Sequence, residues 1–269
     1  MSGTRTSPVG RTAPDGAPRG GDDRPRESYR QVVARLAAAQ KSGRGAPAYS
    51  RYVNRPLGRR LAAAAFLAGL TPNAVTALSG VASFTGIAVL ALAPRGWVVG
   101  LLVALLLVLG YALDAADGQL ARLRGGGSPS GEWLDHMVDC AKISSLHLAV
   151  LVSTWRAAEA GEVALGWALL PMAFAVVAAT SFFAQILNEQ LRRAHGVEGA
   201  RLAQGSSALR SLLAAPTDYG LLCVVFLLLG SSAAFTAGYG LLLAGSAGYL
   251  ALALVKWYRE MDALGSPAR

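Results

Sequence analysis

The chain has 269 residues, of which 53% are hydrophobic and only 15% are charged, whereas about 25% of the residues are charged in an ordinary soluble domain. This composition argues against a water-soluble globule. The formal net charge is +9, but residues 1–60 hold 13 of the 25 basic residues and only 4 of the 16 acidic ones. This segment therefore carries the whole net charge, and a nucleic-acid-binding domain with a basic folded surface is not expected.

The N-terminal region divides into two parts. Residues 1–26 are rich in Gly, Pro and Arg and almost lack large apolar side chains, so they predict a disordered basic tail. Because this tail lacks the apolar core of a secretory signal, we expect the N-terminus to stay on the side of synthesis. Residues 27–70 predict an amphipathic and juxtamembrane helical segment.

An amphipathic helix is predicted over residues 28–40. Its apolar side chains follow the i, i+3, i+4, i+7 spacing of one helix face: Tyr29, Val32, Val33 and Leu36. Two placements fit this pattern. The helix can lie on an anionic membrane surface as an interfacial helix, which the arginines that follow it favour, or it can pack against the protein's own cytosolic end.

From residue 71 onward, long apolar runs alternate with short polar breaks, and a helix needs about 20 residues to cross the hydrocarbon core. The sequence therefore predicts an all-α integral membrane protein with a transmembrane domain over residues 71–261 and a tail over residues 262–269. The fifth run is the shortest and the break at residues 230–234 is weak, so five spans are an alternative to six. The predicted spans cover residues 72–93, 96–121, 133–154, 166–188, 216–232 and 234–256.

Basic residues are distributed unevenly between the two ends of these spans. With a cytoplasmic N-terminus, 22 of the 25 basic residues fall on the cytoplasmic side and only Arg95 and Arg156 on the other. This is the positive-inside pattern, so we expect a multi-pass protein of the cell membrane with both termini in the cytoplasm. The remaining basic residue, Lys142, lies within the third predicted span, where an ionisable side chain needs a partner or a function.

Four aspartates flank the short connection between the second and third predicted spans, near the cytoplasmic edge of the membrane. With about 100° per helical residue, Asp114 and Asp117 share one face of the second span. Asp135 and Asp139 share one face of the third. Clustered carboxylates repel one another unless cations neutralise them, and hard oxygen ligands select Mg²⁺ or Mn²⁺. The pattern therefore predicts a site for two divalent ions, which can bridge a pyrophosphate and assist an in-line displacement at phosphorus.

Small residues and one arginine lie on the same helix faces as the aspartates. Gly118, Ala121 and Gly131 have side chains small enough for a nucleotide to approach the helix backbones. Arg122 can neutralise phosphate oxygens. We therefore expect these four residues to contact a nucleotide.

Together these residues form the pattern D-x2-D-G-x2-A-R-x8-G-x3-D-x3-D over residues 114–139, with every position filled. This pattern resembles the signature of the CDP-alcohol phosphotransferase family. Residues 71–76, Thr-Pro-Asn-Ala-Val-Thr, are similar to the TPNxVT opening of that family's first span, and they also fit a helix start with Thr71 as the N-cap. On this resemblance, Asn73 and Thr76 join the predicted CDP contacts.

The resemblance implies transfer of a phosphoalcohol group from a CDP-alcohol to the hydroxyl of a second alcohol, with release of CMP. It also implies that Asp114, Asp117 and Asp135 are metal ligands. Asp139 would be both a metal ligand and the general base that deprotonates the acceptor hydroxyl. We expect transfer of the phosphatidyl group of CDP-diacylglycerol in phospholipid biosynthesis. Transfer of a CDP-linked polar head group to a lipid alcohol is the alternative.

The acceptor site is predicted less directly, because the motif recognises only the CDP part. Lys142 and four arginines are candidates for holding a phosphate group on the acceptor. The arginines also fit an ordinary basic cytosolic loop, and Lys142 can instead balance the charge of the acids. The four arginines are Arg192, Arg193, Arg201 and Arg210.

Two residues outside the motif have simpler predicted roles. His147 lies off the acidic face of its helix and is predicted to be a packing or hydrogen-bonding residue. Asp218 follows Pro216 at a predicted helix start, where a first-turn acid is favoured over a contact with the acceptor.

The sixth predicted span carries a row of small residues. These residues, Gly240, Ala244 and Gly248, permit close helix packing within the chain or in a homodimer.

Two other classes of function are alternatives to an enzyme. They are a transporter that relays ions through intramembrane acids and a scaffold without catalysis. Neither of them would release CMP from a CDP-alcohol.

Overall fold

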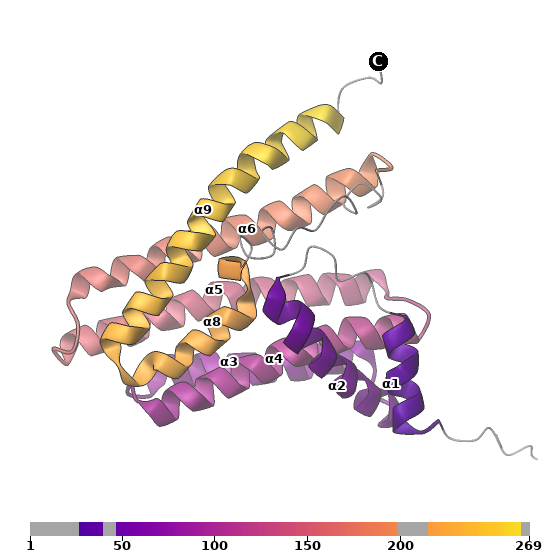
Figure 1. The fold of residues 1–269 in the computed structure, drawn as a ribbon, viewed down its shortest axis with the longest axis horizontal. Coiled ribbons are helices and arrows are strands. Elements are labelled where there is room, and N and C mark those ends of the chain that lie inside the picture. The colour runs from indigo at the N-terminus through magenta and orange to yellow at the C-terminus, as the bar shows by residue number, and fades with distance from the viewer. Residues whose placement is uncertain (1–26, 40–46, 198–214, 265–269) are drawn as a thin grey trace, which may run out of the picture.

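The computed structural model of the chain describes residues 27–39, 47–197 and 215–264. All regular structure in these residues is helical, which confirms the all-α prediction (Figure 1). The elements are α1 (Tyr29–Ala38), η1 (Ser50–Asn54), α2 (Arg55–Leu67), α3 (Pro72–Leu92), α4 (Trp97–Leu123), α5 (Pro129–Glu159), η2 (Leu165–Ala168), α6 (Leu169–Ala194), η4 (Ala215–Thr217), α8 (Tyr219–Val225), η5 (Phe226–Gly230) and α9 (Ser232–Leu264).

Five helical segments in the described part of the chain are long and apolar enough to cross a membrane. They are α3, α4, α5, the segment Leu165–Ala194 that η2 and α6 form, and α9. The chain is therefore a multi-pass membrane protein.

The run predicted as the fifth span, residues 216–232, contains a shorter apolar segment, Tyr219–Gly230. Its α-helical part, α8, ends at Val225 and continues as the 3₁₀ turn η5. Together α8 and η5 rise about 20 Å, against a hydrocarbon core of about 30 Å. The six predicted runs are thus all helical, but only five of them reach the length of a full crossing.

α3 begins at the residue that the sequence predicts. The Thr71 hydroxyl accepts a hydrogen bond from the backbone N–H of Ala74 at 3.2 Å, and Pro72 is the first helical residue. α3 then packs against both α4 and α5, so it supports the two helices that carry the motif.

The connection between α4 and α5 is short. Gly125 and Gly126 have φ angles of 98° and 130°, which side chains other than glycine rarely allow. The Ser128 hydroxyl then caps α5 by accepting a hydrogen bond from the backbone N–H of Gly131 at 3.0 Å. α5 therefore begins at Pro129, several residues before the start of the predicted apolar span.

α1 packs on the rest of the protein through one face. Val32 and Leu36 are buried with apolar residues of α2 and α4, including Ala62 and Leu120. Of the two predicted placements of this helix, its contacts show the one in which it packs against the protein. Contact between α1 and a membrane surface stays a prediction.

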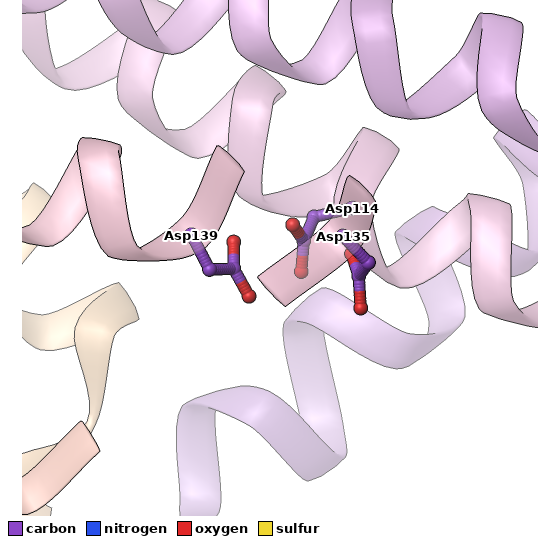
Figure 2. Close-up of side chains that lie close together, drawn as sticks. All are labelled: Asp114, Asp135 and Asp139. Atoms are coloured by element: carbon purple, nitrogen blue, oxygen red, sulfur yellow. The ribbon is translucent and has the colours of Figure 1, made fainter. Parts of the chain in front are cut away.

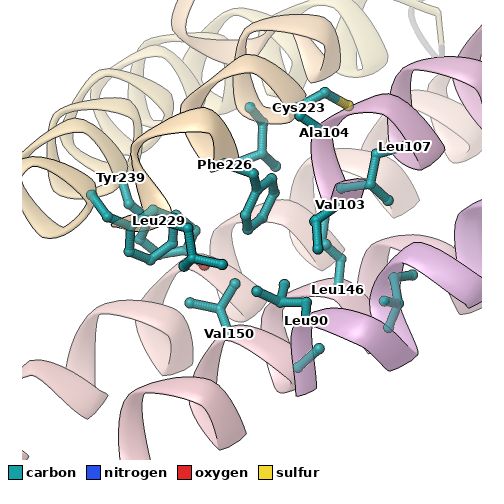
Figure 3. Packing of buried hydrophobic residues seen from close by; sticks show 14 of the residues in the cluster. Leu90, Val103, Ala104, Leu107, Leu146, Val150, Cys223, Phe226, Leu229 and Tyr239 are labelled. Atoms are coloured by element: carbon teal, nitrogen blue, oxygen red, sulfur yellow. The ribbon is translucent and has the colours of Figure 1, made fainter. Parts of the chain in front are cut away.

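The larger apolar core holds α8 and η5 against α4, α5 and α9 (Figure 3). Phe226 of η5 is fully buried, and a Cβ at Gly100 of α4 would lie only 2.5 Å from the Phe226 carbonyl oxygen. A 2.6 Å hydrogen bond links His147 Nδ1 to the Tyr239 hydroxyl, and the His147 ring stacks on Phe174. His147 is thus a packing and hydrogen-bonding residue, as predicted.

α6 and α9 pack against each other and extend beyond the other helices (Figure 1). Their C-terminal ends, the helices α1 and α2, and the α4–α5 connection all lie toward one end of the molecule (Figure 1). Arg95 and Arg156 belong to segments at the opposite end. Among the described residues, the basic side chains are thus separated as the positive-inside prediction requires, and the side of the membrane that each end faces stays a prediction.

Candidate active site

Three of the four motif aspartates converge between α4 and α5 (Figure 2). Asp114 of α4 and Asp135 and Asp139 of α5 each offer a carboxylate oxygen, and these three oxygens lie within 4.8 Å of one another. We call these residues the acidic cluster. The helical repeat places Asp135 and Asp139 on one face of α5, and that face is turned toward Asp114. Three carboxylate oxygens at this spacing fit a divalent ion such as Mg²⁺ or Mn²⁺.

Lys142 contacts the acidic cluster from the next turn of α5, and only 5% of this residue is exposed. Its ammonium lies 2.6 Å from Asp114 Oδ1 and 2.8 Å from Asp139 Oδ1. It donates a third hydrogen bond to the Ser79 hydroxyl at 3.2 Å. A lysine ammonium has three N–H donors, so each has a partner. These contacts fit the charge-balancing role, and contact between Lys142 and an acceptor stays a prediction.

Asp117 does not join the acidic cluster. The side chain is almost fully buried, and its Oδ2 accepts a hydrogen bond from the Thr76 hydroxyl at 2.6 Å. α3 therefore positions this aspartate. In this structure Thr76 and Asp117 contact each other. Metal binding by Asp117 and a CDP contact by Thr76 stay predictions.

The small residues of the motif lie on the side of the acidic cluster that faces the α4–α5 connection. A Cβ at Gly131 would lie 3.2 Å from Asn73 Oδ1, so the first turns of α3 and α5 are close together. A Cβ at Gly118 would meet only the Arg122 side chain, at 3.4 Å. Ala121 follows on the last turns of α4. The predicted CDP contacts therefore lie at the start of α3, the end of α4 and the start of α5, next to the acidic cluster.

The helical membrane fold and the complete motif agree with a comparison against known protein families. The family model described as CDP-alcohol phosphatidyltransferase matches residues 69–257. The chain belongs to the CDP-alcohol phosphatidyltransferase family. This is a family of transferases for phosphate-containing groups, and the match confirms the resemblance seen in the sequence. A search of curated proteins finds no match to the chain.

Two arginines predicted to bind the acceptor are engaged in ion pairs in this family member. Arg192 pairs with Glu260 of α9, and Arg193 pairs with Glu132 of α5 at 2.7 Å. These pairs join the last turns of α6 to its two neighbours, and acceptor binding by either arginine stays a prediction. The other two arginines lie outside the described residues: Arg201 and Arg210.

Two tyrosines beside the acidic cluster were not anticipated from the sequence. Tyr111 lies one helical turn before Asp114 on α4, and its ring meets the ring of Tyr219 edge-on with centroids 5.1 Å apart. The Tyr219 hydroxyl is buried and has no hydrogen-bond partner among the described residues. The three-residue spacing of Tyr111 and Asp114 was a usable signal. The position of Tyr219 depends on tertiary packing and left no local signal.

Asp218 positions the segment that carries Tyr219. It caps α8, because its Oδ1 accepts a hydrogen bond from the backbone N–H of Gly220 at 3.1 Å. Its Oδ2 accepts another from the backbone N–H of Ser50 at 3.1 Å. Asp218 therefore acts at a helix start, as the favoured prediction states, and it also joins α8 to η1.

Proposed function

We propose that this chain transfers a phosphoalcohol group from a CDP-alcohol to the hydroxyl of a second alcohol and releases CMP. The donor in this proposal is CDP-diacylglycerol and the product is a phospholipid. The observation that carries the proposal is the convergence of Asp114, Asp135 and Asp139 within the complete family motif. The five membrane-crossing helices support a lipid-linked donor, because such a donor lies in the same bilayer as the protein.

The proposed cofactor is Mg²⁺ or Mn²⁺, with two ions in the site. Asp114, Asp117, Asp135 and Asp139 would hold these ions, and three of the four already lie close enough to share one. When bound, the ions offset the negative charge on the phosphate oxygens during the transfer.

Asp139 is the general base in this proposal, since a carboxylate next to the reacting phosphate can accept the acceptor's proton. The acceptor oxygen forms a bond to the β-phosphorus of the donor while its proton moves to Asp139. The bond from the β-phosphorus to the oxygen that bridges to CMP breaks in line with the new bond. The bridging oxygen leaves with CMP, and Asp139 then releases the proton to water.

The CDP part of the donor would lie at the ends of α3, α4 and α5. Gly118, Ala121 and Gly131 leave room for it, and Asn73 lies beside Gly131. The exposed Arg122 guanidinium would neutralise phosphate oxygens. We place this end of the molecule in the cytoplasm at the cell membrane, because it carries most of the basic residues that the structure describes.

A donor-by-acceptor screen on the purified protein tests the proposal. CDP-diacylglycerol and a soluble CDP-alcohol are offered with polar alcohols, their monophosphates and a lipid alcohol, and both CMP and lipid products are measured. We expect CDP-diacylglycerol and one polar acceptor to give CMP and a phospholipid in equal amounts. Absence of CMP from every pair would contradict the proposal. CMP formed only from the soluble donor and the lipid alcohol would keep the reaction but reverse the proposed roles of lipid and head group.

A further inference from the structure

Lys142 is not one of the motif positions, yet it contacts two of the three residues of the acidic cluster. Its Nζ lies 2.6 Å from Asp114 Oδ1 on α4 and 2.8 Å from Asp139 Oδ1 on its own helix. One ammonium thus lies between the carboxylates of two helices and neutralises part of their charge.

The third partner of Lys142 fixes the ammonium from another side. The Ser79 hydroxyl accepts its hydrogen bond at 3.2 Å and itself donates a 2.9 Å hydrogen bond to the carbonyl oxygen of Gly110. Lys142 is therefore held by α3, α4 and α5 together. A buried ammonium and half-buried carboxylates are each costly without partners, so this arrangement stabilises the site when no metal is bound.

The same carboxylates are the ligands that the proposed function assigns to a metal ion. Asp114 Oδ1 and Asp139 Oδ1 lie against an ammonium, and a divalent cation placed beside that ammonium is repelled at short range. The ammonium and the metal ion therefore compete for Asp114 and Asp139.

We propose that Lys142 is an exchangeable internal counter-ion of the acidic cluster. It neutralises Asp114 and Asp139 in the metal-free protein, and a divalent cation binds by displacing its ammonium from these carboxylates. Metal affinity is then lower than the aspartates alone would give, and the metal-free protein keeps its helices together. The inference rests on the metal site of the proposed function and not on the identity of the donor or acceptor.

Mn²⁺ binding by the purified full chain, without substrates, tests this inference. The electron paramagnetic resonance signal of free Mn²⁺ gives the affinity, and thermal unfolding in chelator gives the stability of the metal-free protein. In Lys142→Met we expect Mn²⁺ to bind about tenfold tighter or more, because one positive charge next to the ion is lost. The metal-free variant should unfold at a lower temperature than the wild type, and Mn²⁺ should raise its unfolding temperature by more.

Two further variants make the test specific. Lys256→Met also removes one positive charge, but Lys256 lies on α9 and pairs with Glu260 at 3.4 Å, so the Mn²⁺ affinity should stay within about twofold of the wild type. Ser79→Ala keeps every charge and removes one hydrogen bond from the ammonium. It should tighten Mn²⁺ binding by a few-fold, and it decides the question if Lys142→Met does not fold.

Unchanged or weaker Mn²⁺ binding in both Lys142→Met and Ser79→Ala would overturn the inference. A Lys142→Met variant with wild-type Mn²⁺ affinity and a raised acceptor KM would place Lys142 on the acceptor, and would overturn it as well. Tighter Mn²⁺ binding in a protein that releases no CMP in the donor-by-acceptor screen would support the inference and contradict the proposed function.

Discussion

At the scale of single residues, Asp139 is the motif aspartate with two proposed roles. It belongs to the acidic cluster and is also the proposed base. Asp139→Asn keeps the size of the side chain but removes its ability to accept a proton. We expect turnover to fall by about 10² or more, with a nearly unchanged donor KM, as is usual for the loss of a general base.

Steady-state kinetics with both substrates checks this prediction. Glu132→Gln is the matched control, because Glu132 lies on the same helix, is exposed and pairs with Arg193. The control should turn over at about the wild-type rate. Normal turnover of Asp139→Asn would show that Asp139 is not the base.

Two buried tyrosine hydroxyls differ in whether they have a partner. The Tyr239 hydroxyl is hydrogen-bonded to His147, whereas the Tyr219 hydroxyl has no partner among the described residues. Tyr239→Phe should therefore lower the free energy of unfolding by about 1 kcal/mol or more, while Tyr219→Phe should cost nothing. Unfolding of both variants in the same detergent measures the difference. Equal destabilisation by the two changes would contradict the assignment.

At the scale of helices, local signals set some ends and tertiary packing sets others. The start of α3 could be predicted, because Thr71 and Pro72 are adjacent capping and first-turn residues. α5 begins at Pro129, before the predicted apolar span, because apolarity does not report the cap at Ser128. The fifth run was predicted to be the shortest, but the end of α8 at Val225 could not be predicted, since the change to a 3₁₀ turn occurs where Phe226 packs on α4.

The candidate site could be predicted only in part from the sequence. The motif spacing and the helical repeat place the acids of α5 on one face, and the structure brings three of the four motif aspartates together. The hydrogen bond from Lys142 to Ser79 could not be predicted, because Ser79 reaches the site from α3. The packing of Tyr219 on Tyr111 could not be predicted either, because Tyr219 lies on α8. Such neighbours depend on how the helices cross, which the local sequence does not encode.

The contact between α4 and η5 gives a prediction at this scale. A Cβ at Gly100 would lie 2.5 Å from the Phe226 carbonyl oxygen, whereas a Cβ at Gly248 of α9 would meet no atom within 4 Å. Gly100→Ala should therefore destabilise the protein by about 1–3 kcal/mol through overpacking. Gly248→Ala should be neutral or stabilising, because alanine favours a helix over glycine.

Thermal unfolding of the two alanine variants in one detergent checks this prediction. If Gly100→Ala were as stable as Gly248→Ala, α8 and η5 would not pack on α4 as the structure has them.

The row of small residues in α9 has one contact within the chain. A Cβ at Gly240 would contact Leu170 of α6 at 3.6 Å, so this part of the row packs within the chain, and a homodimer through the remainder stays a prediction.

At the scale of the whole molecule, the distribution of basic residues predicts the orientation in the membrane. A cysteine at Gly127, in a variant without Cys140 and Cys223, reports on the α4–α5 connection, because a Cβ there meets no atom within 4 Å. In intact cells it should be protected from a membrane-impermeant thiol reagent, and it should be labelled after permeabilisation. A cysteine at Glu162, in the exposed connection after α5, should be labelled in intact cells as well as after permeabilisation. Labelling of the Gly127 position in intact cells would invert the orientation.

The central claim is that the motif aspartates hold a divalent ion on which the transfer depends. The most direct measurement is CMP release by the purified protein from CDP-diacylglycerol and its best acceptor, with Mg²⁺ or Mn²⁺ and then with excess EDTA. Because clustered carboxylates cannot bind the negatively charged pyrophosphate without cations, we predict that EDTA abolishes CMP release and that added Mg²⁺ or Mn²⁺ restores it. Full release of CMP in excess EDTA would contradict the account.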